Sequence, residues 1–135
     1  MPRYHLDANV VLRFLRNDDP QQSPASARLF AAAKAKKVKL SLSTVTLAEI
    51  FYVLARIYKL SRPDAAARLL PLVQSDALDV ESRERVVDCL QRVMNASVDF
   101  GDAYLAATAA ERGDKVSSFD RDLAVFQDVV TDIPR

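Results

Sequence analysis

The chain has 135 residues, which suits one domain with a single core, and half of its residues are apolar, which excludes a disordered protein. Its net charge is +1, so composition alone does not indicate a nucleic-acid-binding protein. The longest uncharged run, Leu40 to Ala48, is far shorter than the roughly 20 residues of a membrane span. We therefore expect no membrane association, and the lone Cys89 excludes an internal disulfide and fits a reducing cytoplasm.

In the first half of the chain, strand-like and helix-like patterns alternate. Capping residues mark the helix starts: Asp7 follows the first strand, and Ser23 with Pro24 forms a helix entry. An alanine-rich stretch then predicts a helix that persists to about Lys37. The elements predicted here are a strand over 3–6, a helix over 9–16, a helix over 25–37 and a strand over 38–43.

The helix predicted from Thr44 is apolar on almost every side, so we expect it to be largely buried. Glu49 is its only acid and shares a face with Val45 and Val53. Burial of an unpaired carboxylate is costly, and Arg56, two helical turns away, is poorly placed for an ion pair. Glu49 is therefore expected to pair with a base from elsewhere, to be protonated or to bind a cation.

The second half continues the alternation. Ser61 with Pro63 indicates a helix start, and Pro71 is expected to kink or end that helix. The further elements predicted are a short strand over 77–80, an amphipathic helix over 81–95 and, near the end of the chain, an edge strand at 129–130.

Between these last two elements, the stretch over 98–123 predicts a helix, a strand and a second helix. Gly113 falls just after the first of these helices, where a positive φ is common. The chain contains no repeat and no linker. Strands that alternate with helices favour an α/β fold with one small parallel sheet and helices on both faces.

Acidic residues stand where predicted strands or loops give way to helices. Asp7, Asp102 and Asp120 occupy such positions, and Glu49 lies in the helix after the second strand. Each aspartate taken singly is explained as a helix cap that the macrodipole favours. In a parallel sheet, however, these positions lie along one edge. The acids would then crowd one pocket, which is unfavourable unless a positive charge lies between them.

Arg121 is the only base within these motifs. A hard divalent cation would neutralise the acids, because carboxylate oxygens suit Mg²⁺ or Mn²⁺. Histidine and cysteine are scarce, which argues against zinc, and His5, in a predicted strand, is better explained as a core residue than as a ligand. A site of this kind uses its metal to activate water and to stabilise charge on a transferring phosphoryl group.

Four segments, in order, resemble those of PIN-domain ribonucleases of the VapC type, the toxins of bacterial toxin–antitoxin pairs. They are YHLDANVVLRFL, STVTLAEIFYVL, VDFGDAYLAATAAERG and VSSFDRDL. The resemblance covers nearly the whole chain and implies a single PIN-like domain over 1–135. It also implies that the acids of these segments bind metal and catalyse: Asp7, Glu49, Asp102 and Asp120.

The resemblance implies supporting roles as well. Asp122 would be an auxiliary acid, and Asn9 and Ser118 would be polar supports of the site, whereas we assign Asp99 to the cap of its helix. The family commonly has Thr or Ser directly after the first aspartate. Ala8 stands there in this chain, so a hydroxyl that would support the first acid is missing.

The implied activity is hydrolysis of RNA phosphodiester bonds with Mg²⁺ or Mn²⁺, leaving a 5′-phosphate and a 3′-hydroxyl. The resemblance further implies a homodimer in the cytoplasm, inhibited by a cognate antitoxin whose C-terminal segment covers the acidic cleft. Basic residues would contact RNA phosphates, although the simpler interpretation of the lysines is a solvated helix end. These residues are Arg13, Arg16, Lys34, Lys36, Lys37 and Lys39.

Two other classes compete with the nuclease. A non-catalytic PIN-like binding module would have the same fold and act through dimer or partner contacts without turnover. A phosphoacceptor receiver domain would have adjacent acids after its first strand and a lysine after its last core strand. Here Asp7 has no acidic neighbour and Lys115 precedes its strand, which argues against the receiver.

Overall fold

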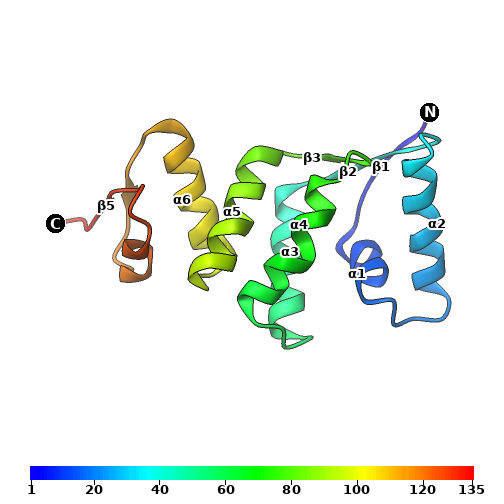
Figure 1. Ribbon diagram of the computed structural model, residues 1–135, viewed down its shortest axis with the longest axis horizontal. Coiled ribbons are helices and arrows are strands. Elements are labelled where there is room, and N and C mark those ends of the chain that lie inside the picture. The colour runs from blue at the N-terminus through cyan, green and yellow to red at the C-terminus, as the bar shows by residue number, and fades with distance from the viewer.

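A computed structural model describes residues 1–135. Helices separate the strands throughout, as the alternating sequence patterns predicted (Figure 1). The elements in chain order are β1 (Arg3–His5), α1 (Ala8–Arg16), α2 (Gln22–Lys34), β2 (Lys39–Leu42), α3 (Thr44–Arg56), α4 (Arg62–Gln74), β3 (Leu78–Val80), α5 (Arg83–Ala96), α6 (Phe100–Arg112), β4 (Val116–Ser117), the short 3₁₀ helix η1 (Arg121–Val125) and β5 (Thr131–Asp132).

The strands form two separate parallel sheets. β1, β2 and β3 make one sheet in that order, with Tyr4 opposite Leu40 and Leu40 opposite Leu78. β4 pairs only with β5. The α/β class and the small parallel sheet predicted from the sequence are thus confirmed, but the strand after α6 does not join the first sheet.

Side chains alternate between the two faces of the three-stranded sheet, as the pleat requires. Leu40, Leu42 and Val80 are buried on the face that the helices cover. His5 and Asp79 lie exposed on the other face, where Arg3 donates to Asp79 at 2.7 Å. His5 is therefore not the core residue that we expected from its strand position.

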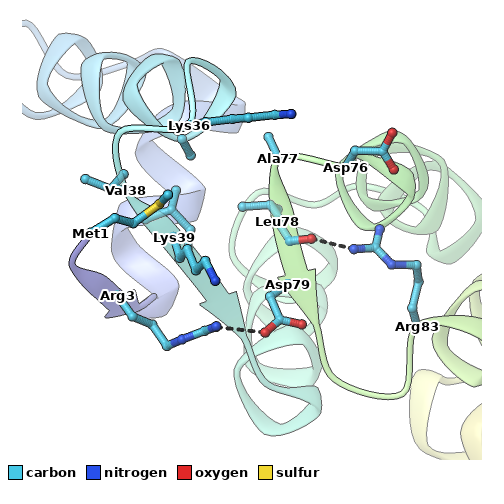
Figure 2. A pocket seen from close by; sticks show the side chains of 12 residues that line it. Met1, Arg3, Lys36, Val38, Lys39, Asp76, Ala77, Leu78, Asp79 and Arg83 are labelled. Atoms are coloured by element: carbon cyan, nitrogen blue, oxygen red, sulfur yellow. Dashed lines mark hydrogen bonds and ion pairs between the residues drawn. The ribbon is translucent and has the colours of Figure 1, made fainter.

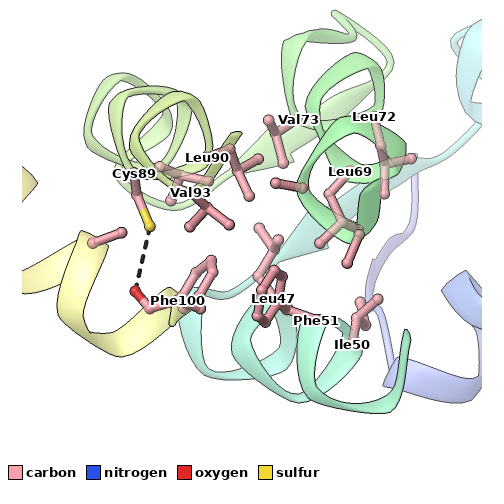
Figure 3. Close-up of a cluster of buried hydrophobic side chains, with 14 of the residues drawn as sticks. Leu47, Ile50, Phe51, Leu69, Leu72, Val73, Cys89, Leu90, Val93 and Phe100 are labelled. Carbon is pink, nitrogen blue, oxygen red and sulfur yellow. Dashed lines mark hydrogen bonds between the residues drawn. The ribbon is translucent and has the colours of Figure 1, made fainter. Parts of the chain in front are cut away.

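The core forms mainly where α3, α4 and α5 meet the start of α6 (Figure 3). Leu47, Leu69 and Leu90 are completely buried there, and the Phe51 and Phe100 rings pack with centroids 5.6 Å apart. Cys89 is also buried, and burial raises the pKa of its thiol to about 12. Its Sγ donates to the carbonyl of Phe100 at 3.6 Å. Cys89 is therefore an inert core thiol.

Several element boundaries differ from the sequence-based expectation, among them the end of α2, which was expected near Lys37 and lies at Lys34. Ser23 does not begin α2 but lies buried inside it. The Asp19 carboxylate accepts hydrogen bonds from the backbone amides of Gln21 and Gln22, so the helix begins before Ser23. Pro71 does not end α4, which continues past it to Gln74. The last strand lies two residues later than expected, at Thr131–Asp132.

The molecule is elongated in Figure 1, where β5 and α6 lie on one side of α5 and the pair α1–α2 lies at the opposite end. β1 and the β4–β5 sheet are thus separated by α3, α4 and α5. None of the helices combines the length and the apolar character that crossing a membrane demands.

Candidate metal centre

Three carboxylates converge at the start of α6 and the start of η1. Asp102 lies in the first turn of α6, and Asp120 and Asp122 lie at the N-terminus of η1. One carboxylate oxygen from each residue lies within 4.8 Å of the others. Two segments separated by β4 therefore supply oxygen ligands to one point, and we call these three residues the acidic cluster.

Local hydrogen bonds hold the two segments that carry the cluster. The Asp99 carboxylate caps α6 and accepts from the Phe100 amide at 2.9 Å, so Asp99 is the cap that the sequence predicted. Asp120 accepts from the Asp122 amide at 2.9 Å, and Ser118 Oγ accepts from the Asp120 amide at 2.9 Å. The loop after β4 is thereby ordered around the Asp120 carboxylate.

The negative charge of the cluster is only partly offset by a nearby base. Burial raises the pKa of Asp102, and the neighbouring carboxylates of Asp120, Asp99 and Asp122 raise it further, whereas Arg62 opposes them. None of the ion pairs in the chain includes a cluster residue. Three hard oxygen donors close together, none of them in an ion pair, are a donor set that fits a divalent cation such as Mg²⁺ or Mn²⁺.

Two other predicted site acids lie outside the cluster. Asp7 follows β1 and caps α1, where it accepts from the Asn9 amide at 3.3 Å. Glu49 lies on α3. Neither belongs to the group of acids that share one point, and neither is among the charges that act on Asp102. The reason is topological: β4 does not pair with β1, so the carboxyl ends of these two strands do not adjoin within one chain.

The expectation that Glu49 is buried is wrong. α3 turns one face to the core and leaves the face of Glu49 exposed, together with Val45 (80% exposed) and Tyr52 (56% exposed). Apolar residues on all sides of a helix do not show which sides other elements cover. Glu49 therefore needs no base, proton or cation to compensate for burial.

The basic residues predicted to contact RNA fall into two groups. Arg13 donates to Asp18 at 3.1 Å and to Gln22 at 3.0 Å, and the Arg16 guanidinium lies 4.5 Å from the Tyr58 ring centroid. Both side chains thus have structural partners at the end of α1. The remaining residues are exposed between the end of α2 and the start of β2: Lys34, Lys36, Lys37 and Lys39.

These lysines lie at the amino end of the three-stranded sheet, whereas Asp7 follows its carboxyl end. Figure 2 shows Lys36 and Lys39 beside a pocket of about 350 Å³ that Arg3 and Asp79 also line. The lysine group and the first predicted acid thus occupy opposite ends of the strands.

Sequence reasoning missed one basic residue near the cluster. Arg62, at the start of α4, and Arg121 border a pocket of about 450 Å³ that Asp122 also lines. The Arg62 guanidinium donates to the Ser97 carbonyl at 3.2 Å, just before α6. Arg62 is far from the acids in sequence, so only the packing of α4 beside the start of α6 reveals it.

Comparison with known families decides the class of this chain. A model of the PIN domain family matches residues 4–129, which contain all four predicted acids and the acidic cluster. The chain belongs to the PIN domain family. No protein of curated function matches it.

PIN domains are in general metal-dependent nucleases, so family membership points to nuclease-type chemistry. The three convergent carboxylates of this PIN domain could hold the divalent metal that the family generally uses. The match also decides against a receiver domain, the third class considered from the sequence.

Proposed function

We propose that this PIN domain is an endoribonuclease that hydrolyses RNA phosphodiester bonds with Mg²⁺ or Mn²⁺ as cofactor. The observation that carries the proposal is the acidic cluster: three carboxylates from two segments within 4.8 Å, none of them in an ion pair, in a chain of a nuclease family. A protein without a metal-dependent role gains nothing from this repulsion, because Asp99 already caps α6 and Asp120 already caps η1 without the carboxylates of Asp102 and Asp122.

Asp102, Asp120 and Asp122 would hold the cation. When bound, such a cation makes water more acidic and stabilises negative charge on a phosphoryl group. Hydrogen bonds within the chain order the segments that carry these acids. The Asp99 cap fixes the first turn of α6, and Ser118 fixes the loop of Asp120. The two segments that carry the carboxylates are thus ordered before substrate arrives.

Arg62 and Arg121 are suited to bind the substrate. They lie beside the cluster at the rim of the same pocket, and guanidinium groups are good ligands for phosphate oxygens. We assign them to RNA phosphates on either side of the cut bond. The lysines at the end of α2 would contact more distant phosphates, so RNA binding is expected to weaken as salt is raised.

The biological setting rests on the order of the four sequence segments. They resemble VapC toxins, and we propose on that ground that the protein is the cytoplasmic toxin of a toxin–antitoxin pair. It would act as a homodimer and be inhibited by its cognate antitoxin. The exposed face of α3 with Val45 and Tyr52 offers an apolar surface for a protein partner.

The test is cleavage of a mixed RNA pool by the wild-type protein and by Asp102→Asn. We expect wild-type cleavage that requires Mg²⁺ or Mn²⁺, and a loss of at least about 100-fold in the variant, the scale of removing a transition-state electrostatic contact. Sequencing of the new 5′ ends then identifies the cut sites.

Asp114→Asn is the matched control, because Asp114 is an exposed aspartate near the other end of α6 with no side-chain partner. It should cleave like the wild type. Undiminished cleavage by Asp102→Asn, or cleavage in excess chelator, would contradict the proposal.

One observation favours a second candidate, a PIN-like binding module without turnover. Asp7 and Glu49 lie outside the acidic cluster within one chain, so the four acids predicted to act together are divided. A partner that binds stoichiometrically, combined with no metal-dependent cleavage of any RNA in the pool, would establish the binding module instead.

A further inference from the structure

The two parallel sheets each leave one strand edge open. Every residue of β1 is exposed, including Tyr4 at 48%, and the backbone of β1 bonds only to β2. β4 likewise pairs on one side only. Open edges and two-stranded sheets are marginally stable by themselves, because their peptide groups have no partners.

The other two edges of these sheets are protected. Arg83 covers β3, since its guanidinium donates to the carbonyls of Leu78, Val73 and Ser75 (Figure 2 shows the contact with Leu78). Pro134, which has no amide hydrogen to donate, stands two residues after the end of β5 and limits its extension. Only β1 and β4 therefore remain available for a further parallel strand.

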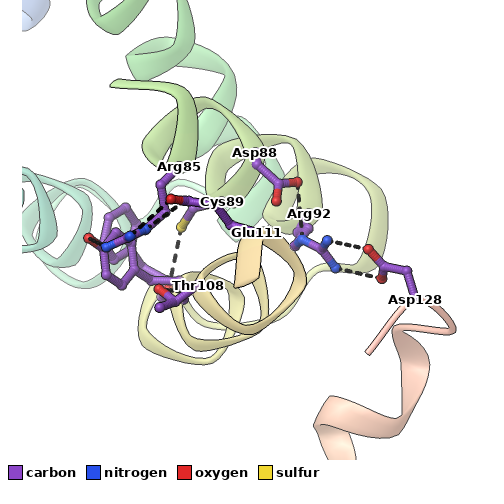
Figure 4. Close-up of polar contacts among 9 residues, drawn as sticks. Arg85, Asp88, Cys89, Arg92, Thr108, Glu111 and Asp128 are labelled. Carbon is purple, nitrogen blue, oxygen red and sulfur yellow. Dashed lines mark hydrogen bonds and ion pairs between the residues drawn. The ribbon is translucent and has the colours of Figure 1, made fainter. Parts of the chain in front are cut away.

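Packing against α5 keeps these two open edges apart within one chain. Arg85 donates to Glu111 of α6 at 2.9 Å, and Arg92 donates to Asp128, just before β5, at 2.9 Å (Figure 4). Phe100 at the start of α6 is buried in the core. For β4 to reach β1 of its own chain, the segment after α5 would have to leave all of these contacts.

We propose that two copies of this chain exchange these edges, so that β4 of one copy pairs in parallel with β1 of the other. The arrangement is symmetric, and exchange of an identical element is a low-cost route to a dimer. In each copy it would lengthen the three-stranded sheet by the β4–β5 pair of the second copy. Both open edges would then be paired.

The exchange completes the divided set of acids. Parallel strands place their carboxyl ends at the same edge of a sheet, with about 4.8 Å between neighbouring strands. Asp7 follows β1 and Asp120 follows β4, so Asp7 of one copy would adjoin the acidic cluster of the other. The pairing rests on the strand edges alone, whereas the activity of the composite site rests on the proposed nuclease function.

Apolar side chains near the exchanged elements are exposed in the single chain. Phe119, directly after β4, is 76% exposed, and Val45 and Tyr52 lie exposed on the face of α3 that also carries Glu49. Large exposed apolar groups of this kind mark surfaces that a protein partner covers. A second copy of the chain is the partner that both open strands and the divided acids require.

Mixing two inactive variants tests the composite site. Asp7→Asn and Asp102→Asn chains are unfolded, mixed in equal amounts and refolded together, with circular dichroism as the check of folding. In an exchange dimer, each mixed pair has one site with both acids intact, so the mixture should regain roughly a quarter of wild-type cleavage because half of the pairs are mixed. Each variant refolded alone should remain inactive. No recovery in a mixture of folded dimers would overturn the inference.

Cross-linking tests the strand pairing without relying on activity. His5→Cys and a size-tagged Ser117→Cys chain are refolded together and treated with a short bismaleimide, to which the buried Cys89 is protected. We expect a covalent pair of one tagged and one untagged chain only in the mixture. A monomeric mass without such a pair refutes the exchange. If the variants give the cross-linked pair but the wild type cuts no RNA, only the proposed nuclease function is refuted.

Discussion

At the scale of single residues, Asp102 shows how a helix cap region becomes a candidate ligand site. Its carboxylate lies in the first turn of α6, where a negative charge is normally favourable. Burial and the adjacent acids nevertheless raise its pKa, so the ionised form is less stable in the folded protein than in the unfolded chain. Wherever the pH lies above both pKa values, this cost of ionisation is fully present.

Asp102→Asn should therefore stabilise the protein when metal is removed. Without the charge, we expect the melting temperature in chelator to rise by roughly 1–3 °C. Mg²⁺ should raise the melting temperature of the wild type, since a ligand of the folded state stabilises it, and should have no such effect on the variant. Calorimetry with and without Mg²⁺ measures both. A variant that melts below the wild type in chelator would contradict this account of the cluster.

Residue-level signals in the sequence were reliable where the cause is local. Ser61 caps α4 and accepts from the Asp64 amide, Asp99 caps α6, and Gly113 has a φ of 70°, all as predicted. The exposure of Glu49 could not be predicted in the same way. It depends on which elements pack against α3, and the helix's own composition does not contain that information.

At the scale of elements, α5 holds the C-terminal part of the molecule in place. The Arg92 side chain is only 10% exposed and makes two hydrogen bonds to the Asp128 carboxylate and a third to Asp88 at 3.1 Å. The hydrogen bond from Arg92 lowers the pKa of Asp128. This contact ties the segment before β5 to the middle of α5.

Asp128→Asn should weaken this tie in a pH-dependent manner. Because the pKa of Asp128 is lower in the folded state, its stabilising effect is present above the ordinary pKa of about 3.9 and is lost as pH falls through the lower value. We expect a loss of about 1 kcal/mol in unfolding free energy at pH 7, limited by the exposure of Asp128 to solvent. The difference from the wild type should shrink below about pH 4.

Urea unfolding of both proteins across this pH range measures the effect, and the difference between them cancels the titration of all other groups. Asp114→Asn serves again as the control, with a difference near zero at every pH. A constant loss from pH 7 to pH 3 would show that the contact does not act through the Asp128 charge.

Element order was predictable from the sequence, but sheet assembly was not. The alternation of patterns predicted every strand region except the position of β5. β4 and β5, however, have two residues each, and such short strands carry no signal of their partners. The expectation that Asp7 and Asp120 lie on one sheet edge therefore rested on an assumed single sheet, which one chain does not form.

At the scale of the whole molecule, acidic and basic residues are numerous but nearly balanced, so the net charge is small. A net charge of +1 arises from 19 basic and 18 acidic residues, so local groupings of charge rather than the overall sum must decide what binds. The acidic cluster, with Arg62 and Arg121 beside it, is the local grouping suited to a metal ion and a phosphodiester. Completion of the acid set then depends on how two molecules associate.

Titration of Mn²⁺ into the wild type, Asp120→Asn and Asp114→Asn by calorimetry tests the central claim most directly, because it reports on the cluster without RNA, partner or turnover. We predict saturable binding to the wild type and to Asp114→Asn, and its loss in Asp120→Asn, which removes one of the three converging carboxylates. Equal binding by all three proteins, or no binding by the wild type, would contradict the claim that these acids form a metal centre.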